Sequence, residues 1–411
     1  MSSIAAVDIG STKVVTVIAD LEHPGSPRVV GVGVAPCGGT KRGVVVDIEE
    51  TAQAVVSSVR KAEHMANRKL GSATVSVAGE HLHSQPSRGL VPILNPSRAI
   101  TREDVHRVIN HSKQIAIQGD RELILSVPRS FKIDGRDGIT KPFEMSGERL
   151  EVNTLLITGL SSQLENLQRC IGRAQIDVEQ MIPRALATGL AVTDAAEREQ
   201  GVAVLDIGGG ATDVAVYIDG SPIHLAMLSV GSQHITSDIQ YLLKTTTDEA
   251  ERIKVDAGAC SPEGFGEDDV VEVEQIGNSQ ARPFSKRVLA EIIGSRVREI
   301  FRMASEEIDS AVDPKKLGAG WVVTGGGSKL QGLAEFVETA AGIKVRTAAP
   351  KPFVGMGDML AGPEFATGVG LIKFGLKAQQ DESVTAEAGD SRKLVRSIGS
   401  IFASKPKEEE I

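Results

Sequence analysis

The chain has 411 residues, and a chain of this length is expected to form two to four compact units. Hydrophobic residues make up 41% of the chain but aromatic residues only 3%, so its cores must be largely aliphatic. The formal net charge of −9 argues against nucleic acid as the main partner and confines any anion-binding site to a local patch.

The cysteines and the hydropathy of the chain indicate the cellular compartment in which it folds. Cys37, Cys170 and Cys260 are odd in number and lack CxxC spacing, which indicates free thiols in a reducing cytosol. The N-terminus has no basic region followed by an apolar segment, and no apolar run reaches the ~18 residues that span a bilayer. We therefore expect neither export nor a membrane-spanning helix.

The first recognisable unit is a strand, a glycine turn and a second strand. Residues 7–14 read Val-Asp-Ile-Gly-Ser-Thr-Lys-Val and lie between two apolar, β-branched runs. This pattern predicts a hairpin with Asp8 at the end of its first strand. A helix from Asp47 to about Arg68 and a buried strand at 73–77 are expected to follow.

Residues 81–160 differ in character and predict a small inserted α+β subdomain. We expect a helix capped at Thr101, with an apolar face that includes Ile115, and strands at 123–127 and 150–157. Ser162-x-x-Glu165 has the spacing of a capping box and predicts the start of a helix that runs to about Ala174.

The hairpin pattern then returns. A strand at 176–182 and a helix from Pro183 precede residues 205–214, which read Leu-Asp-Ile-Gly-Gly-Gly-Ala-Thr-Asp-Val. After it, Thr246-x-x-Glu249 predicts a helix start, and a strand is expected at 270–276. Because strands and helices alternate around a repeated hairpin, we expect two related α/β domains that face each other.

The last part of the chain holds a long helix, a third glycine run and a polar segment. The helix is expected at 285–311; its apolar positions predict core packing, with a partner-binding surface as the alternative. A strand at 321–324 ends in Gly-Gly-Gly-Ser and precedes a helix at 330–341. Residues 377–391 are polar and predict a flexible linker.

The two hairpins carry the residue types that hold a nucleotide phosphate. Glycines let backbone N–H groups approach phosphate oxygens, hydroxyl and lysine side chains add donors, and carboxylates hold Mg²⁺ through its water shell. A single Asp-Gly hairpin is more often only a turn. Two copies with acids at matching positions reverse that balance and make phosphate binding the better hypothesis. The candidates are Asp8, Gly10, Ser11, Thr12, Lys13, Asp206, Gly208, Gly209, Gly210, Thr212 and Asp213, with Asp8 and Asp206 as metal ligands and Asp213 in a supporting place.

Other nucleotide-binding classes are disfavoured. The chain has no GxxxxGK[ST] motif, so it is not a P-loop protein, and no GxGxxG opens a βαβ unit. The glycine run at 325–328 is weak alone, since glycine after a strand usually marks a tight turn.

The C-terminal residues 392–407 combine an apolar helical face with basic residues and contain no acid. The pattern indicates a helix that lies in an anionic membrane surface, and an ordinary docked helix or a fraying tail is the equal alternative from sequence alone. The residues expected to contact the membrane are Leu394, Val395, Arg396, Ile398, Ile401 and Phe402.

These motifs resemble those of the actin-like ATPase superfamily, and over nearly the whole chain the sequence is similar to the FtsA family of bacterial cell-division proteins. The similarity is carried by the two hairpins, by 155–159, by 231–254 and by 320–332. It implies an actin-like, ribonuclease-H-like duplicated two-domain α/β fold with an inserted α+β subdomain, 1C, and a C-terminal amphipathic helix. The implied units are 1–80 and 161–196 (subdomain 1A), 81–160 (1C), 197–376 (domain 2, whose last helix returns to 1A), 377–391 (linker) and 392–407 (membrane helix).

The resemblance also implies ligands for the site. ATP and Mg²⁺ would lie between the hairpins, Glu251 and Lys254 would contact the nucleoside, and the third glycine run would contact the adenosine through Gly325, Gly326, Gly327 and Ser328. One departure concerns catalysis. Where some relatives carry a glutamate that positions the attacking water, this chain offers Arg184, which cannot act as a base. We assign no catalytic residue and expect at most slow ATP hydrolysis.

The resemblance implies a protein that polymerises at the cytoplasmic face of the membrane and tethers FtsZ at the division septum. Its implied partners are the FtsZ C-terminal peptide, other copies of itself, the anionic lipid surface and downstream division proteins that bind through 1C; nucleic acid is not expected. The resemblance also favours the membrane role for residues 392–407. The alternatives are a pilus-assembly ATPase of the PilM kind, a small-molecule kinase of the same superfamily, and a chaperone, although no substrate-binding domain follows residue 376.

Overall fold

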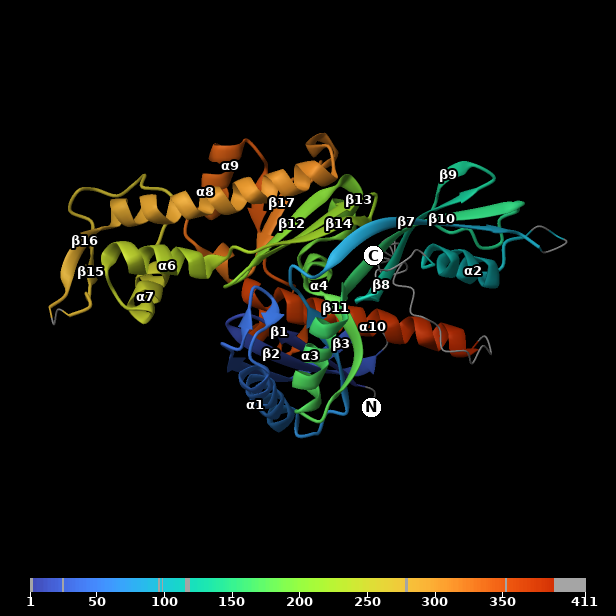
Figure 1. The fold of residues 1–411 in the computed structure, drawn as a ribbon, viewed down its shortest axis with the longest axis horizontal. Coiled ribbons are helices and arrows are strands. Elements are labelled where there is room, and N and C mark those ends of the chain that lie inside the picture. The colour runs from blue at the N-terminus through green and yellow to red at the C-terminus, as the bar shows by residue number, and fades with distance from the viewer. Residues whose placement is uncertain are drawn as a thin grey trace.

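Two α/β halves of similar build make up the body of the protein. The computed structural model describes residues 3–23, 26–94, 97, 99–114, 119–277, 280–351 and 353–387. One sheet lies in each half, and in Figure 1 the sheet with β12, β13 and β14 lies above the sheet with β1, β2 and β3.

The first half is built on a sheet of six strands in the order β11-β6-β1-β2-β3-β19. Its strands are β1 (Ser3–Ile9), β2 (Lys13–His23), β3 (Ser26–Pro36), β6 (Ser72–Val77), β11 (Asp177–Pro183) and β19 (Val354–Gly355). Strands β1, β2 and β3 form an antiparallel meander, whereas β6 runs parallel to β1 and to β11. The apolar outer face of the sheet is covered by α1 (Ile48–Ala66) and α3 (Ser161–Gly172).

The second half repeats this topology. Its five strands have the order β14-β13-β12-β17-β18. They are β12 (Val202–Ile207), β13 (Thr212–Ile218), β14 (Ser221–Leu228), β17 (Trp321–Thr324) and β18 (Val345–Thr347). Again the first three strands form an antiparallel meander, and the fourth runs parallel to the first. The matching order confirms the duplicated fold that the repeated hairpin predicts.

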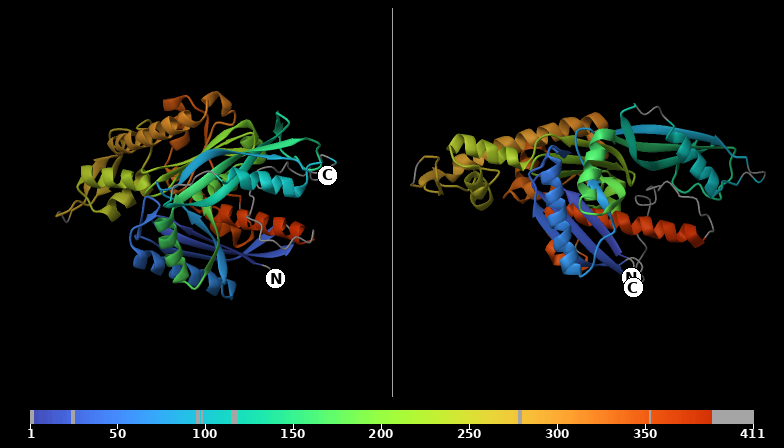
Figure 2. Two further views of the ribbon diagram at one scale, coloured as in Figure 1. Left: turned by 45° about the vertical axis from the view of Figure 1, so that its right-hand side comes forward. Right: turned by 60° about the horizontal axis from the view of Figure 1, so that its bottom comes forward.

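Two helices pack between the sheets. Helix α4 (Arg184–Val192) is buried along its whole length and packs against α10 (Ala366–Glu387). Helix α10 also contacts β1, and α4 contacts β12, so one apolar core joins the two halves. Small residues permit this contact: a β carbon added to Gly370 would lie 1.8 Å from the Ala187 carbonyl oxygen. Figure 2 shows α10 running beneath the second sheet in both views.

The outer face of the second sheet carries the longest helix of the described chain. Helix α8 (Lys286–Ala311) buries Leu289, Ile293 and Val297, and its Phe301 stacks on Trp321 with ring centroids 6.1 Å apart. Core packing is therefore confirmed for most of its apolar positions. Around it lie α6 (Ser232–Leu243), α7 (Thr247–Ala257), α9 (Leu333–Ala341), β15 (Val270–Val273) and β16 (Arg282–Ser285), whereas α5 (Ala195–Gln200) contacts β13.

An inserted unit projects from the opposite end of the molecule to α6 and α7 (Figures 1 and 2). It consists of a four-stranded antiparallel sheet in the order β7-β10-β8-β9 and one helix, α2. The elements are β7 (His83–Pro92), α2 (Arg102–Ser112), β8 (Arg121–Ile133), β9 (Arg136–Ile139) and β10 (Arg149–Leu160). Its strand β7 also reaches the second half, where Ser84 Oγ lies 3.1 Å from the Leu225 carbonyl oxygen and 3.2 Å from its amide nitrogen. The short strands β4 (Thr40–Lys41) and β5 (Val44–Val45) lie beside the first hairpin.

Most local predictions are confirmed, and two need correction. Asp47 caps α1, Thr101 caps α2 with a full capping box, and Thr246 caps α7. The predicted capping box at Ser162 is wrong, because α3 starts at Ser161 directly after β10, and Leu160 at its N-cap makes no side-chain bond. The Asp120 carbonyl accepts the Ser161 amide at 2.9 Å instead.

The C-terminal predictions fall partly outside the described chain. Helix α10 runs to Glu387, so 377–387 is helical where a flexible linker was predicted. The rest of that segment, all of 392–407 and Ile115 lie outside the described residues. No helix among the described residues combines the length and apolar character needed to cross a membrane.

Candidate functional site

The turns of the two hairpins have the same local structure. In the first, the Gly10 amide donates to the Lys13 carbonyl at 2.9 Å; in the second, the Gly208 amide donates to the Ala211 carbonyl at 3.0 Å. Each turn directly follows a fully paired strand, β1 or β12, so its backbone position is fixed by the sheet. The repeated sequence therefore folds into a repeated structure, one copy in each half.

These turns face each other across the boundary between the halves. A β carbon added to Gly209 would lie 2.5 Å from Cγ2 of Thr12, and one added to Gly210 would lie 3.0 Å from Oγ of Ser11. Approach this close leaves room for glycine but for no larger residue without movement. The structure thus brings Ser11, Thr12, Gly209 and Gly210 together, as the sequence predicts.

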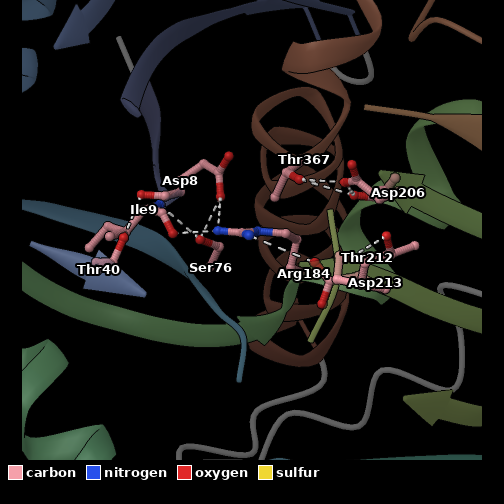
Figure 3. A network of polar contacts seen from close by, with 12 residues as sticks. Asp8, Ile9, Thr40, Ser76, Arg184, Asp206, Thr212, Asp213 and Thr367 are labelled. Carbon is pink, nitrogen blue, oxygen red and sulfur yellow. Dashed lines mark hydrogen bonds and ion pairs between the residues drawn. The ribbon is translucent and has the colours of Figure 1, made fainter. Parts of the chain in front are cut away.

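The strand-end carboxylates are held by hydroxyl groups from neighbouring elements. Ser76 on β6 donates to Asp8 at 2.7 Å, and Thr188 on α4 donates to Asp206 at 2.8 Å. Thr367 on α10 adds a longer bond of 3.3 Å to Asp206. These three hydroxyl groups fix the carboxylate orientations, and sequence reasoning missed all of them. Figure 3 shows Ser76 beside Asp8 and Thr367 beside Asp206. A lone serine or threonine in a helix or strand gives no signal of such a long-range contact.

Arg184, the first residue of α4, lies between the two hairpins. Its guanidinium is 3.3 Å from Asp8 of the first hairpin and 3.7 Å from Asp213 of the second, and it donates to the Ile9 carbonyl. Figure 3 shows this side chain pointing from α4 toward Asp8 and Ser76. Although burial opposes its charge, Asp8 and Asp213 raise the pKa of Arg184 above the ordinary arginine value, so it is always protonated.

Burial disfavours the ionised form of the two carboxylates of the second hairpin. Burial raises the pKa of Asp213 to about 7, and Arg184 offsets only part of that effect. Burial likewise raises the pKa of Asp206, against the opposing influence of Arg184 and the Thr188 hydroxyl. A further cation near these groups would therefore be favourable.

Lys13, which directly follows the turn of the first hairpin, contributes a second positive charge. Its ammonium lies 4.2 Å from the centre of the Phe365 ring, and burial lowers the pKa of Lys13 while Glu364 opposes that shift. Glu364 itself pairs with Lys329 at 2.5 Å. Lys13 therefore faces the turn η4 (Pro363–Phe365) and remains within electrostatic reach of Asp8 and Asp206.

The third glycine run packs against the end of β12. A β carbon on Gly325 (φ +83°) would lie 2.2 Å from Oδ1 of Asp206, and one on Gly327 would lie 2.4 Å from Cγ2 of Ile207. Ser328 closes its own turn, since its hydroxyl donates to the Gly325 carbonyl at 2.8 Å. The segment, which forms η2 (Gly326–Lys329), thus lies beside the second hairpin.

Glu251 and Lys254 reach the same region through the start of α6. Lys254 donates to Glu251 at 2.7 Å and to Thr236 at 2.8 Å, and its ammonium lies 3.3 Å from the Ser232 carbonyl. The Ser232 amide in turn donates to the Gly208 carbonyl at 2.9 Å. One connected set of contacts therefore joins α7, α6 and the second hairpin.

The donor set fits Mg²⁺ bound largely through water. Among the described residues, no three His, Cys, Asp or Glu side chains converge closely enough to enclose a metal ion. Mg²⁺ keeps most of its waters and is usually held by one or two carboxylates together with phosphate oxygens. Asp8 and Asp206, which end the first strands of the two hairpins, suit that mode.

Comparison with known proteins gives matches over most of the chain. Residues 203–370 match the family model described as cell division protein FtsA, and residues 79–158 match the SHS2 domain inserted in FTSA. Cell division protein FtsA of Neisseria meningitidis serogroup B is 38% identical over 92% of this chain and 91% of its own length. The protein of the same name from Escherichia coli K12 is 31% identical over 97% of this chain and 95% of its own.

Solved structures share the fold at low identity. The PilM-PilN type IV pilus biogenesis complex contains a chain that is 18% identical and superposes with a TM-score of 0.63 over 91% of this chain and 98% of that one. MreB5 of Spiroplasma citri bound to ADP is 11% identical, with a TM-score of 0.55 over 95% of this chain and 99% of that one. These likenesses show the actin-like fold, and the match of residues 79–158 to the SHS2 domain identifies its insertion.

Proposed function

The chain belongs to the FtsA family of cell-division proteins, and we propose that it is an ATP-binding, actin-like protein that polymerises at the inner face of the cytoplasmic membrane and tethers FtsZ filaments there at the division septum. The observation that carries this proposal is the meeting of the two hairpin turns across the boundary between the halves. A ligand bound at both turns would hold the halves in one relative orientation.

ATP with Mg²⁺ fits this place best. The backbone of both turns and the Ser11, Thr12 and Lys13 side chains would hold the phosphates, and Mg²⁺ would be held near Asp8 and Asp206. Gly325–Ser328 on one side and Glu251 with Lys254 on the other would contact the nucleoside. In MreB5 of S. citri, a protein of the same fold, ADP is bound.

Turnover is expected to be slow. Arg184 occupies the start of α4 next to Asp8, and a permanent cation cannot accept a proton from water. ATP then serves to set the shape in which copies of the chain assemble, rather than to drive rapid chemistry. Steady hydrolysis above ~1 s⁻¹, within the ordinary enzyme range, would contradict this part of the proposal.

The FtsZ C-terminal peptide is proposed to bind a groove between α6 and α8. The groove has a volume of about 480 Å³ and is lined by Tyr241 and Leu242 of α6 and by Val288 and Ile292 of α8. Tyr241 is 83% exposed and Leu242 is 56% exposed, unusually high values for such large apolar side chains. Arg296, paired with Asp238 at 2.7 Å, supplies a cation beside these apolar groups.

Membrane attachment is assigned to residues 392–407. Five partly buried apolar side chains would contribute ~5 kcal/mol, and each basic residue near anionic lipid up to about 1 kcal/mol. The cost of ordering a tail with Gly399 at its middle reduces both contributions. One tail then binds reversibly, and a polymer that carries many tails binds cooperatively.

The inserted unit is proposed to receive downstream division proteins and neighbouring copies of the chain. It exposes apolar side chains at one end, among them Leu94, Phe143 and Met145. The pilus-assembly and kinase alternatives are not favoured, because the relatives that match nearly the whole chain at 31–38% identity are division proteins.

Co-sedimentation with liposomes of anionic lipid, with and without ATP and FtsZ, tests the proposal. The full chain should pellet with the liposomes, and FtsZ should pellet only when the chain is present. A chain that binds neither liposomes nor FtsZ in the presence of ATP would overturn the tethering role.

A further inference from the structure

We infer that Arg184 is a fixed cation that supplies part of the positive charge a divalent metal would otherwise bring to the phosphates. This protein would then bind nucleotide with little dependence on Mg²⁺. The inference rests on the proposed nucleotide site and concerns how that site balances its charge. It starts from the position of the guanidinium between Asp8 of one half and Asp213 of the other.

The contacts place this charge where phosphates are expected. Arg184 donates to the carbonyl of Ile9, the residue directly before the first glycine turn, and a β carbon on Gly10 would lie 4.0 Å from its Nη2. The guanidinium therefore lies against the first turn itself. A polyphosphate held by that turn would meet this positive charge without any bound ion.

Its ion pairs keep this buried arginine charged and make it hard to displace. The Arg184 side chain is only 10% exposed, and those of Asp8 and Asp213 are 12% and 7% exposed. Separating a buried ion pair by removing one partner is costly, because the other charge stays buried without compensation. A metal ion that entered here would have to compete with an arginine that is already paired.

The far side of the guanidinium leaves no space for a hydrated ion. Among the described residues, Nε of Arg184 has no hydrogen-bond partner, and Arg184 lines a cavity of about 20 Å³ together with Asp213, Ser84 and Met227. That volume admits one water molecule, which would satisfy Nε, but not a metal ion with its water shell. Arg184 is therefore the fixed cation on this side, and a metal can approach only from the side of Asp8 and Asp206.

The test measures ADP and ATP affinity of the full chain in Mg²⁺ and in EDTA. Three variants are compared with the wild type: Arg184→Met removes the charge, Arg184→Lys retains it, and Arg198→Met is the control. Arg198 is a second buried arginine, bonded to the Thr193 carbonyl at 2.9 Å and remote from the hairpin turns.

We expect the wild-type Kd to rise less than about tenfold when Mg²⁺ is removed, whereas metal-free binding by Arg184→Met should weaken by about 30-fold or more. The metal-free Kd of Arg184→Lys should remain near that of the wild type. Arg198→Met should keep the wild-type ratio of Kd in EDTA to Kd in Mg²⁺. Thermal unfolding of each variant separates loss of binding from loss of fold.

Two results would overturn the inference while leaving nucleotide binding intact. One is wild-type binding that disappears in EDTA, which decides the matter even if Arg184→Met does not fold. The other is an Arg184→Met protein whose ratio of Kd in EDTA to Kd in Mg²⁺ equals that of the wild type. Absence of ADP and ATP binding even in Mg²⁺ would instead overturn the nucleotide site, and this inference with it.

Discussion

Gly209 faces Thr12 across the boundary between the halves so closely that a β carbon on Gly209 would lie 2.5 Å from Cγ2 of Thr12. We predict that Gly209→Ala pushes the turns apart and weakens ATP binding by about tenfold, within the 1–3 kcal/mol that overpacking typically costs. Equilibrium binding of ATP in Mg²⁺ measures the effect.

A second substitution identifies the clash as the cause. Serine lacks the Cγ2 atom, so Thr12→Ser in the Gly209→Ala background should restore most of the lost affinity, which is a non-additive result. Gly172→Ala is the control, since a β carbon there would meet nothing within 4 Å. Additive losses in the double variant would contradict the proposed contact.

Lys254 should support nucleotide binding through the nucleoside. Lys254→Met removes its contacts to Glu251 and Thr236, and leaves two polar groups without their cation. We expect ATP and ADP affinities to fall together, by about 10- to 100-fold, because the γ-phosphate is not involved. Arg252→Met on the same helix is the control, since Arg252 pairs with Glu249 instead, at 2.7 Å. A loss confined to ATP would place Lys254 at the phosphates.

The sequence predicts the hairpins well because their structure is decided locally. An apolar β-branched run, a glycine turn and a second run specify β1 with β2 and β12 with β13 with little help from the rest of the chain. The repeat also predicts that two similar halves face each other, since a duplicated unit folds to a duplicated topology.

The hydroxyl groups that hydrogen-bond to the carboxylates could not be predicted in this way. Thr188 and Thr367 meet Asp206 only because α4 and α10 pack between the sheets, and that packing depends on contacts far apart in the sequence. Arg184 stood out in the sequence only as a residue unsuited to act as a base. Its place between Asp8 and Asp213 needed the three-dimensional structure.

Phe402→Glu should release the protein from anionic liposomes while leaving ATP binding intact. The change puts a negative charge on the apolar face of 392–407, next to anionic lipid, and removes one of five apolar side chains. Ser400→Glu makes the same change in charge on what would be the opposite face of the proposed helix and should have the smaller effect. Unchanged sedimentation of the Phe402→Glu protein would remove the membrane role from this segment.

Val288→Glu should weaken binding of the FtsZ C-terminal peptide by about tenfold or more, because it places a charge among the apolar groups of the α6–α8 groove. Fluorescence anisotropy with a labelled peptide measures this. Val255→Glu is the matched control: Val255 is an exposed valine on α7, 69% exposed against 43% for Val288, and does not line the groove. Equal loss in both variants would mean that the peptide does not use the groove.

Lys373 should make stability depend on pH in the alkaline range. It lies on α10 with its ammonium 3.3 Å from the Leu190 carbonyl and 3.4 Å from that of Ala191. Burial, together with Arg198 and Lys351, lowers the pKa of Lys373 to about 8 from the ordinary 10.5. Between these values the unfolded chain binds more protons than the folded one, so this group makes the free energy of unfolding rise with pH.

The cost of the buried charge is therefore full below pH 8 and disappears as pH rises through about 10.5. Lys373→Met removes that cost and should gain roughly 1–3 kcal/mol relative to wild type at pH 7, with a smaller gain at pH 10. Lys61→Met is the control, because Lys61 also donates to a backbone carbonyl, that of Val34, from an exposed position. Urea unfolding at the two pH values measures the difference; a gain that is equal at both would mean that Lys373 titrates normally in the folded protein.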